Sequence, residues 1–273
     1  MPGALTLAPL PAACTSACGS TRLAGYALPV ALHPTAAIVT IGNEIVSGDV
    51  QNTNGSWLAK RLEGHGVSVR LQLAIRDEQE QIVTFLRALA AQVDVLIVTG
   101  GLGGTPDDIT REALAATFGV GQQVHEPTAA ALRARFTRHP EYAARFADLP
   151  VGAAPLRNPL GGAPGFQLHN VFVLPGLPSE MEAMFDEVVV PALPGEARVP
   201  IGSWKRKWRT NESTIVDALV EFERLHPEVG LGSYPSFHAH GSEVELVLKS
   251  RDPHALAVAA AWLERAVDDL LAG

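Results

Sequence analysis

A glycine-rich segment followed at once by two neighbouring carboxylates is the strongest chemical signal in the sequence. It reads Gly100-Gly101-Leu102-Gly103-Gly104-Thr105-Pro106-Asp107-Asp108. Glycine has no Cβ and adopts positive φ readily, so a backbone rich in glycine can bring its N–H groups close to a bound anion. We therefore expect the amides from Gly101 to Thr105 to hold a phosphate group.

The two carboxylates, Asp107 and Asp108, would repel a phosphate bound at the same place. A divalent cation between phosphate and carboxylate removes that conflict, because hard cations prefer oxygen ligands. We expect both residues to be catalytic metal ligands for Mg, Mn or Co, with a monovalent cation as a further candidate. Glu44 follows an apolar run and is the third predicted catalytic residue, because it could position metal-bound water.

A structural interpretation of the same loop also stays open. Paired glycines simply turn a strand into a helix, and Thr105, Pro106 and Asp108 have the spacing of an N-cap, a first-turn proline and a capping-box residue. One aspartate would then cap the helix while the other complements its dipole. In either interpretation a helix is predicted from Asp107 to Phe118.

The elements that must position this loop alternate between short apolar runs and helical periodicity. Such alternation predicts an α/β fold, with a doubly wound, mostly parallel sheet, over residues 36–192. The loop follows the clearest apolar strand, at the carboxyl end where such sheets bind ligands. Asp77 and Glu80 have the spacing of a capping box at the start of a helix. The predicted strands are 36–41, 67–75, 93–99 and 171–174, and the predicted helices lie near 57–62, 77–89 and 178–189.

A Pro- and Gly-rich break at 190–195 predicts a domain boundary. The order strand, helix, strand, strand, helix over 200–273 predicts a second, smaller α+β domain. Its basic run Trp204-Lys205-Arg206-Lys207-Trp208-Arg209 resembles an RNA-binding strand with interleaved aromatics. Alternation on a strand with two different faces explains the run equally well and is the interpretation we favour.

Composition limits the classes of partner. The chain has 273 residues, 47% of them hydrophobic, and a formal net charge of −8, which opposes binding to nucleic acid or to an anionic membrane surface. No apolar run is long enough to span a bilayer. Both cysteines, Cys14 and Cys18, lie in residues 1–35, which we expect to be a disordered extension. A cytoplasmic protein with a small-molecule partner is predicted.

Five blocks lie in order along residues 36–190: Thr40–Gly48, Asn52–Asn54, Gly100–Arg111, Asn158–Phe166 and Leu174–Met181. Together they resemble the molybdopterin-binding (MoCF) family with its MogA- and MoaB-like members. Within this family they are most similar to the competence-damage-inducible CinA proteins and to the N-terminal half of eukaryotic FAD synthases. Two short segments of the second domain, 211–213 and 232–235, are similar to the small domain that follows in CinA-type proteins.

The resemblance implies a domain that binds the phosphate of a pterin or nucleotide at the carboxyl edge of its sheet. For CinA-type members it implies a metal-dependent ADP-ribose pyrophosphatase that releases AMP and ribose 5-phosphate, in a homo-oligomer for which a dimer is favoured. The chain ends at Gly273, before the deamidase domain of full-length CinA proteins, so deamidase activity is not expected. The expected phosphate- or nucleotide-binding residues are Gly42, Ser47, Gly48, Asn52, Asn54, Gly100, Gly101, Leu102, Gly103, Gly104, Thr105, Asn158, Gly165, Pro175, Gly176, Ser179 and Glu180.

Two positions depart from the family pattern. Asn52 stands where many relatives carry an acidic residue, and Gly104 where a proline is usual. Ser47 and Asn54 could instead cap the following helix. Two other functions therefore remain open: a molybdopterin- or nucleotide-binding protein that transfers an adenylyl group in molybdenum cofactor biosynthesis, and a nucleotide-binding module without catalysis.

Overall fold

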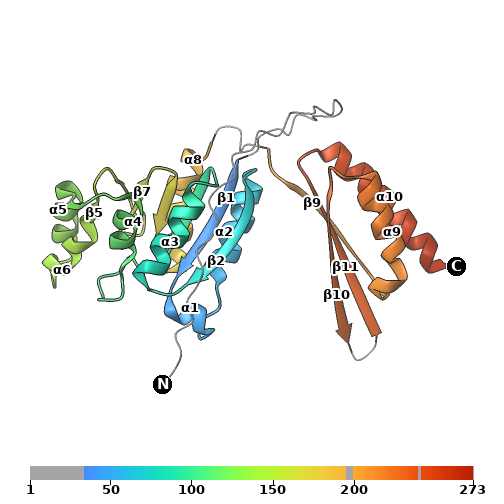
Figure 1. Cartoon of the computed structure of the whole chain (residues 1–273), viewed down its shortest axis with the longest axis horizontal. Helices are drawn as coiled ribbons and strands as arrows, with labels where there is room; N and C mark the ends of the chain where they lie inside the picture. Colours follow the sequence, from blue (N-terminus) through green and yellow to red (C-terminus); the bar gives the residue numbers. More distant parts are fainter. Residues whose placement is uncertain (1–33, 195–198, 239–240, 273) are drawn as a thin grey trace, which may run out of the picture. The chain divides into compact units, whose positions relative to one another are not determined.

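The computed structural model describes residues 34–194, 199–238 and 241–272 (Figure 1). The predicted disordered extension, with both cysteines, lies outside the described residues except for Pro34 and Thr35, and Thr35 already belongs to the first strand. Within the described ranges no helix is both long enough and apolar enough to cross a membrane.

A six-stranded sheet in the order β2-β1-β3-β8-β7-β6 organises the first part of the chain. Its first four strands are parallel, while β7 and β6 add an antiparallel edge that the sequence analysis did not predict. The predicted doubly wound α/β class is confirmed. The strands are β1 (Thr35–Ile41), β2 (Ser68–Ile75), β3 (Val95–Thr99), β6 (Ala154–Leu156), β7 (Gly165–Leu168) and β8 (Val171–Leu174).

Helices cover both faces of this sheet, because alternate residues of each buried strand point to opposite sides. In β1, Val39 and Ile41 join the core beneath α3 and α4, whereas Ala36 and Ile38 join the core beneath α2 and α7. The helices are α1 (Asn43–Ser47), α2 (Thr53–Gly64), α3 (Gln79–Ala90), α4 (Thr110–Phe118), α5 (Glu126–Arg135), α6 (Pro140–Ala144), α7 (Pro178–Met184) and α8 (Val190–Ala192), with short turns η1 (Arg145–Ala147) and η2 (Phe185–Val189) and a small sheet of β4 (Gln122–Val124) and β5 (Asp148–Pro150).

The strand order changes direction between β1 and β3. The chain passes from β1 to β2 on one side, and then to β3 on the other side of β1. The connections that leave β1 and β3 therefore diverge at their carboxyl ends, which leaves a crevice between them.

Two predicted helix starts are wrong. The helix expected from Asp107 begins at Thr110, with Ile109 as its N-cap, because the Asp108 carboxylate bonds back into the preceding loop. The capping box predicted for Asp77 is also absent: α3 begins at Gln79, and Asp77 accepts a hydrogen bond from the backbone of Asn43 instead.

The second part of the chain contains a three-stranded antiparallel sheet in the order β10-β11-β9, packed against two helices through one apolar core. The predicted order of elements is confirmed. The elements are β9 (Gly202–Trp208), α9 (Glu212–Leu225), β10 (Gly230–His238), β11 (Gly241–Ser250) and α10 (Pro253–Ala272).

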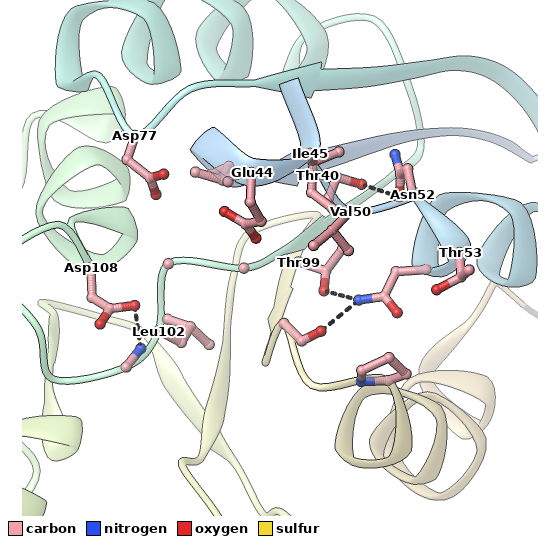
Figure 2. A pocket seen from close by; sticks show the side chains of 18 of the residues that line it. Thr40, Glu44, Ile45, Val50, Asn52, Thr53, Asp77, Thr99, Leu102 and Asp108 are labelled. Atoms are coloured by element: carbon pink, nitrogen blue, oxygen red, sulfur yellow. Dashed lines mark hydrogen bonds between the residues drawn. The ribbon is translucent and has the colours of Figure 1, made fainter. Parts of the chain in front are cut away.

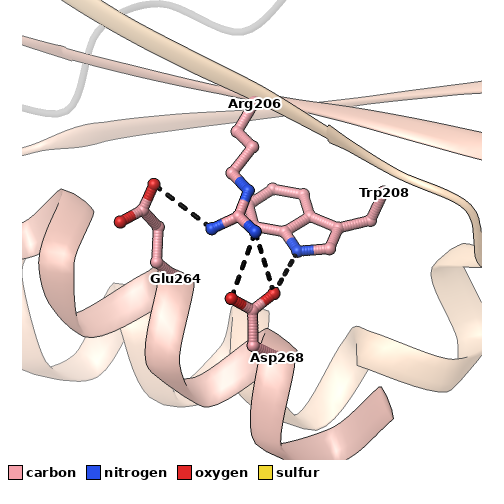
Figure 3. Close-up of polar contacts among 4 residues, drawn as sticks. All are labelled: Arg206, Trp208, Glu264 and Asp268. Atoms are coloured by element: carbon pink, nitrogen blue, oxygen red, sulfur yellow. Dashed lines mark hydrogen bonds and ion pairs between the residues drawn. The ribbon is translucent and has the colours of Figure 1, made fainter. Parts of the chain in front are cut away.

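One face of β9 packs on α10, where Trp204 and Trp208 join the second core, whereas Lys205, Lys207 and Arg209 are exposed. Figure 3 shows the contacts of Arg206 and Trp208 on this face. Arg206 stacks on the Trp208 ring, 4.8 Å from its centroid, and forms ion pairs with Glu264 at 3.3 Å and Asp268 at 3.1 Å. Trp208 donates its indole N–H to Asp268 at 2.7 Å. The guanidinium group of Arg206 and the ring of Trp208 thus bind partners within the protein, which agrees with the strand-alternation interpretation.

Candidate active site

A cleft lies at the carboxyl ends of β1 and β3, at the crevice that strand order creates (Figure 2). Its volume is about 280 Å³. The lining comes from the end of β1 with α1, the start of α2, the residue Asp77 after β2, the glycine loop after β3, and the segment after β8. Four connections of the fold, those that follow β1, β2, β3 and β8, thus contribute to one surface.

The cleft brings together many of the residues that the sequence analysis selected, and leaves others outside. It also adds residues that were not predicted, among them Thr40, Thr53, Asp77 and Thr99. Predicted residues that line it are Gly42, Glu44, Asn52, Asn54, Gly100, Gly101, Leu102, Gly103, Asp107, Asp108 and Gly176. Predicted residues that do not line it are Ser47, Gly48, Gly104, Thr105, Asn158, Gly165, Pro175, Ser179 and Glu180.

Some of the predicted residues outside the cleft have structural partners. Asn158 is buried and donates from Nδ2 to Glu180 at 2.9 Å, so the two side chains hold each other. Gly165 lies so close to the Val173 carbonyl in the neighbouring strand that a Cβ would overlap it. Ser47, the last residue of α1, donates its hydroxyl hydrogen to the Asp49 carboxylate.

Glycines in the loop are required by its close approach to β1. Gly100 has φ +105°, and a Cβ at this position would overlap the carbonyl oxygen of Ile41. Gly101 has φ +62°, and its Cβ would overlap the Thr110 hydroxyl, which donates to the Gly100 carbonyl at 2.9 Å. Only residues without a Cβ fit this path.

The carboxylate of Asp108 occupies part of the predicted anion site. It accepts hydrogen bonds from the Gly103 amide at 2.7 Å and from the Thr105 amide at 2.8 Å, and the Thr105 hydroxyl also donates to it. Two of the amides expected to hold phosphate are therefore already paired. Asp108 closes the loop from within, so these two amides are not free to hold a phosphate.

Arg111 fixes the loop from the opposite side. Its guanidinium group is buried and donates to the carbonyls of Leu102 at 2.8 Å and Gly103 at 2.7 Å. Burial lowers the pKa of this guanidinium group. With these carbonyls turned toward α4, the amides of the same peptide segment are available to Asp108 and to the cleft.

We expect Arg111→Met to lower the free energy of unfolding by about 3 kcal/mol, because one buried and one partly buried carbonyl would lose a charged donor. Urea denaturation measures the change. Arg87→Met is the matched control, since Arg87 also donates to two carbonyls, those of Ala116 and Thr117, but is exposed. Its effect should be below about 1 kcal/mol, and equal effects for the two variants would contradict a structural role for Arg111.

Carboxylates gather on one side of the cleft. Figure 2 shows Glu44, Asp77 and Asp108 around the glycine loop. Burial raises the pKa of Asp77, the Asn43 amide at 2.9 Å opposes this, and the charges of Glu44, Asp107 and Asp108 raise it further. The site is therefore electronegative enough to make ionisation of Asp77 harder.

Asp77 is the functional candidate that the sequence analysis missed, because its spacing to Glu80 suggested a helix cap. A better signal was available. Asp77 follows β2 as Glu44 follows β1 and Gly100 follows β3, and the carboxyl ends of neighbouring parallel strands meet at one edge.

These carboxylates are suitable ligands for a hard cation, but they are not arranged as a complete site. Among the described residues, no three His, Cys, Asp or Glu side chains come together closely enough to hold a metal ion. A cation at this place would need oxygen atoms from a bound ligand to complete its coordination.

Amide side chains occupy the part of the cleft next to α2. Asn52 is the N-cap of α2: its Oδ1 accepts from the Gly55 amide at 2.9 Å and from the Thr40 hydroxyl at 3.2 Å. Capping by Asn54, one of its two predicted roles, is therefore wrong. Asn54 instead donates from Nδ2 to the Gly176 carbonyl at 2.8 Å and to the Thr99 hydroxyl at 3.3 Å.

Two family models match separate parts of the chain. The MoCF_biosynth family model, described as probable molybdopterin binding domain, matches residues 37–195. A second model, described as FAD synthase, middle domain, matches residues 207–271.

Relatives extend this similarity along the chain. A protein of Pyrobaculum calidifontis is 37% identical over 87% of this chain and 93% of its own length. A CinA-like protein of Frankia casuarinae is 38% identical over 70% of this chain, which spans 48% of that protein. The crystal structure of CinA from Thermoplasma acidophilum superposes with a TM-score of 0.56 and 30% identity, covering 59% of this chain and 99% of that one. The chain therefore belongs to the molybdopterin-binding domain family and is of the CinA type.

Proposed function

We propose that this chain binds a phosphorylated pterin or nucleotide in the cleft between β1 and β3, together with a divalent cation. The observation that carries the proposal is the meeting of a glycine loop and the carboxylates of Glu44, Asp77 and Asp107 at the switch point of the sheet. Such crevices are the usual ligand sites of doubly wound folds.

A bound cation would account for two features of the cleft, the paired loop amides and the clustered carboxylates. Asp108 already pairs with two loop amides, so backbone groups alone offer a phosphate less than the sequence predicts. Burial raises the pKa of Asp77, and the charges of Glu44, Asp107 and Asp108 raise it further. A cation held by Asp77, Glu44 or Asp107 and by phosphate oxygens would relieve both conflicts, and Mg, Mn and Co are the candidates.

Hydrolysis of a nucleoside-diphosphate sugar is the second function we propose, with ADP-ribose as the substrate. Water would form a new bond to one phosphorus while the bridging P–O bond breaks, which gives AMP and ribose 5-phosphate. The carboxylate of Asp77 lines the cleft and would be placed to take the proton from water when Glu44 or Asp107 holds the cation. The cation would neutralise charge that develops on the phosphates.

One experiment separates these functions. The protein is incubated with ADP-ribose and each metal, AMP release is followed, and binding is measured by calorimetry. AMP release supports the hydrolase, whereas binding without release supports the binding protein. Consumption of ATP together with molybdopterin would indicate adenylyl transfer instead. If neither ADP-ribose, AMP nor molybdopterin binds with any of the metals, the proposed function is wrong.

The oligomeric state is a separate proposal. We propose that the chain forms a homo-oligomer, with a dimer as the favoured state. Light scattering coupled to size-exclusion chromatography gives the mass in solution, and a monomer at all concentrations would contradict this.

A further inference from the structure

Asn54 presents a hydrogen-bond acceptor that the fold leaves unused. Its Nδ2 donates to the carbonyl of Gly176, which can only accept. Its second partner, the Thr99 hydroxyl, gives its own hydrogen to the Pro175 carbonyl at 2.7 Å and so accepts from Asn54. These bonds fix which end of the amide is the nitrogen, and therefore where Oδ1 lies.

The Oδ1 atom of Asn54 is buried and has no hydrogen-bond partner. The whole residue is 7% exposed, yet it lines the cleft. Buried polar atoms in folded proteins nearly always have a partner, and leaving one without a partner is costly. By contrast, Oδ1 of its neighbour Asn52 has two partners, Thr40 and Gly55.

We propose that Asn54 is a specificity-determining residue whose Oδ1 accepts a hydrogen bond from a neutral N–H or O–H donor of the ligand. This inference rests on the proposed function and adds a requirement to it: the ligand must carry a donor as well as a phosphate. A nucleoside monophosphate has this chemistry, with donors on its heterocycle and on its ribose.

The layout of the cleft separates the two requirements. Figure 2 places Asp77 and Asp108 on one side of the view and Thr99, Asn52 and Thr53 on the other. Thr99 is the direct partner of Asn54. Lining residues also include the apolar side chains of Ile45, Val50 and Pro178, which suit the flat face of a sugar or heterocycle better than a second charged group.

Calorimetry with AMP and Mg²⁺ tests the inference. AMP is compared with purine riboside 5′-monophosphate, which lacks the amino group, and with 2′-deoxy and 3′-deoxy AMP, which each lack one hydroxyl. One of these losses is expected to weaken binding to the unchanged protein by about tenfold, because a buried acceptor would stay unpaired. The analogue affected tells whether the donor comes from the heterocycle or from the ribose.

Asn54→Ala should weaken AMP binding by a similar factor and remove the difference between AMP and that analogue. Asn170→Ala is the matched control. Asn170 also donates from Nδ2 to two carbonyls, those of Ala90 and Val93, but does not line the cleft. It should leave the AMP affinity and the preference for AMP unchanged.

Two failures are distinguishable. If AMP binds but all three analogues bind the unchanged protein within twofold of AMP, the donor requirement is overturned while the proposed function stands, and this comparison needs no variant to fold. An equal preference for AMP in Asn54→Ala and the unchanged protein also overturns it. If AMP does not bind at all, the proposed function fails for nucleotides and the inference fails with it.

Discussion

Gly100→Ala is expected to lower the free energy of unfolding by about 4 kcal/mol, the largest stability effect of the changes considered. Two costs add at this position. The backbone has φ +105°, which strains any residue with a Cβ, and that Cβ would overlap the carbonyl oxygen of Ile41 in the neighbouring strand. Urea denaturation measures the change, and ligand affinity should fall as well because the loop must move away from β1.

Gly119→Ala is the control for Gly100→Ala. Gly119 also has positive φ, +67°, as the C-cap of α4, but a Cβ there would meet no atom within 4 Å. This variant should cost about 1 kcal/mol, the cost of the backbone conformation alone. Equal losses in the two variants would show that the contact with Ile41 does not constrain the loop.

Asp77→Asn is expected to weaken metal-dependent ligand binding by about 100-fold while making the free protein more stable at neutral pH. The amide keeps an oxygen that can accept from Asn43, but it removes a negative charge that burial and the neighbouring carboxylates disfavour. Calorimetry with and without metal measures the first effect, and urea denaturation the second. Unchanged metal-dependent affinity would remove Asp77 from the site.

The dependence on pH follows from the direction of the shift. The pKa of Asp77 is higher in the folded than in the unfolded protein, so folding favours the protonated carboxyl. The contribution of this carboxyl to the free energy of unfolding is therefore lost as pH rises through the folded pKa. The added stability of Asp77→Asn should therefore appear at neutral pH and disappear in acid, below the unfolded pKa, where both carboxyls carry a proton.

Asp94→Asn is the control of opposite sign. The backbone amide and the hydroxyl of Thr35 donate to Asp94 at 2.7 and 2.8 Å, and these bonds lower the pKa of its carboxyl. Its stabilising contribution is present above the unfolded pKa and is lost as pH falls through the folded pKa. Asp94→Asn should therefore destabilise the protein at neutral pH and leave ligand affinity unchanged, since Asp94 does not line the cleft.

The fold class could be predicted because burial on both sides leaves continuous apolar runs in β1, β3 and β8. The short strands β6 and β7 were missed. Ala154–Leu156 and Gly165–Leu168 are very short, contain proline or glycine and lie among turns, so they lack a clear strand pattern even though their pairing is local.

The site was harder to predict, because local spacing competes with long-range contacts. Asp77 and Asp108 both match helix-start patterns, yet neither starts a helix. Asp77 accepts from the backbone of Asn43, whereas Asp108 accepts from the Thr105 amide, as in a capping box, and also from the Gly103 amide. Asn158 and Glu180 stand in motif blocks but bond to each other. The residue types indicated which side chains could bind a ligand or a cation. Their hydrogen-bond partners could be identified only from the folded structure.

The Asp108 carboxylate has a consequence for the kinetics and thermodynamics of ligand capture. Because it pairs with the amides of Gly103 and Thr105 before any ligand arrives, the loop has little conformational freedom left to lose. Association then requires no slow rearrangement of the loop, and the entropy of ordering is spent during folding rather than at each encounter. At the glycine loop, a ligand of the proposed kind would therefore meet a segment that is already ordered.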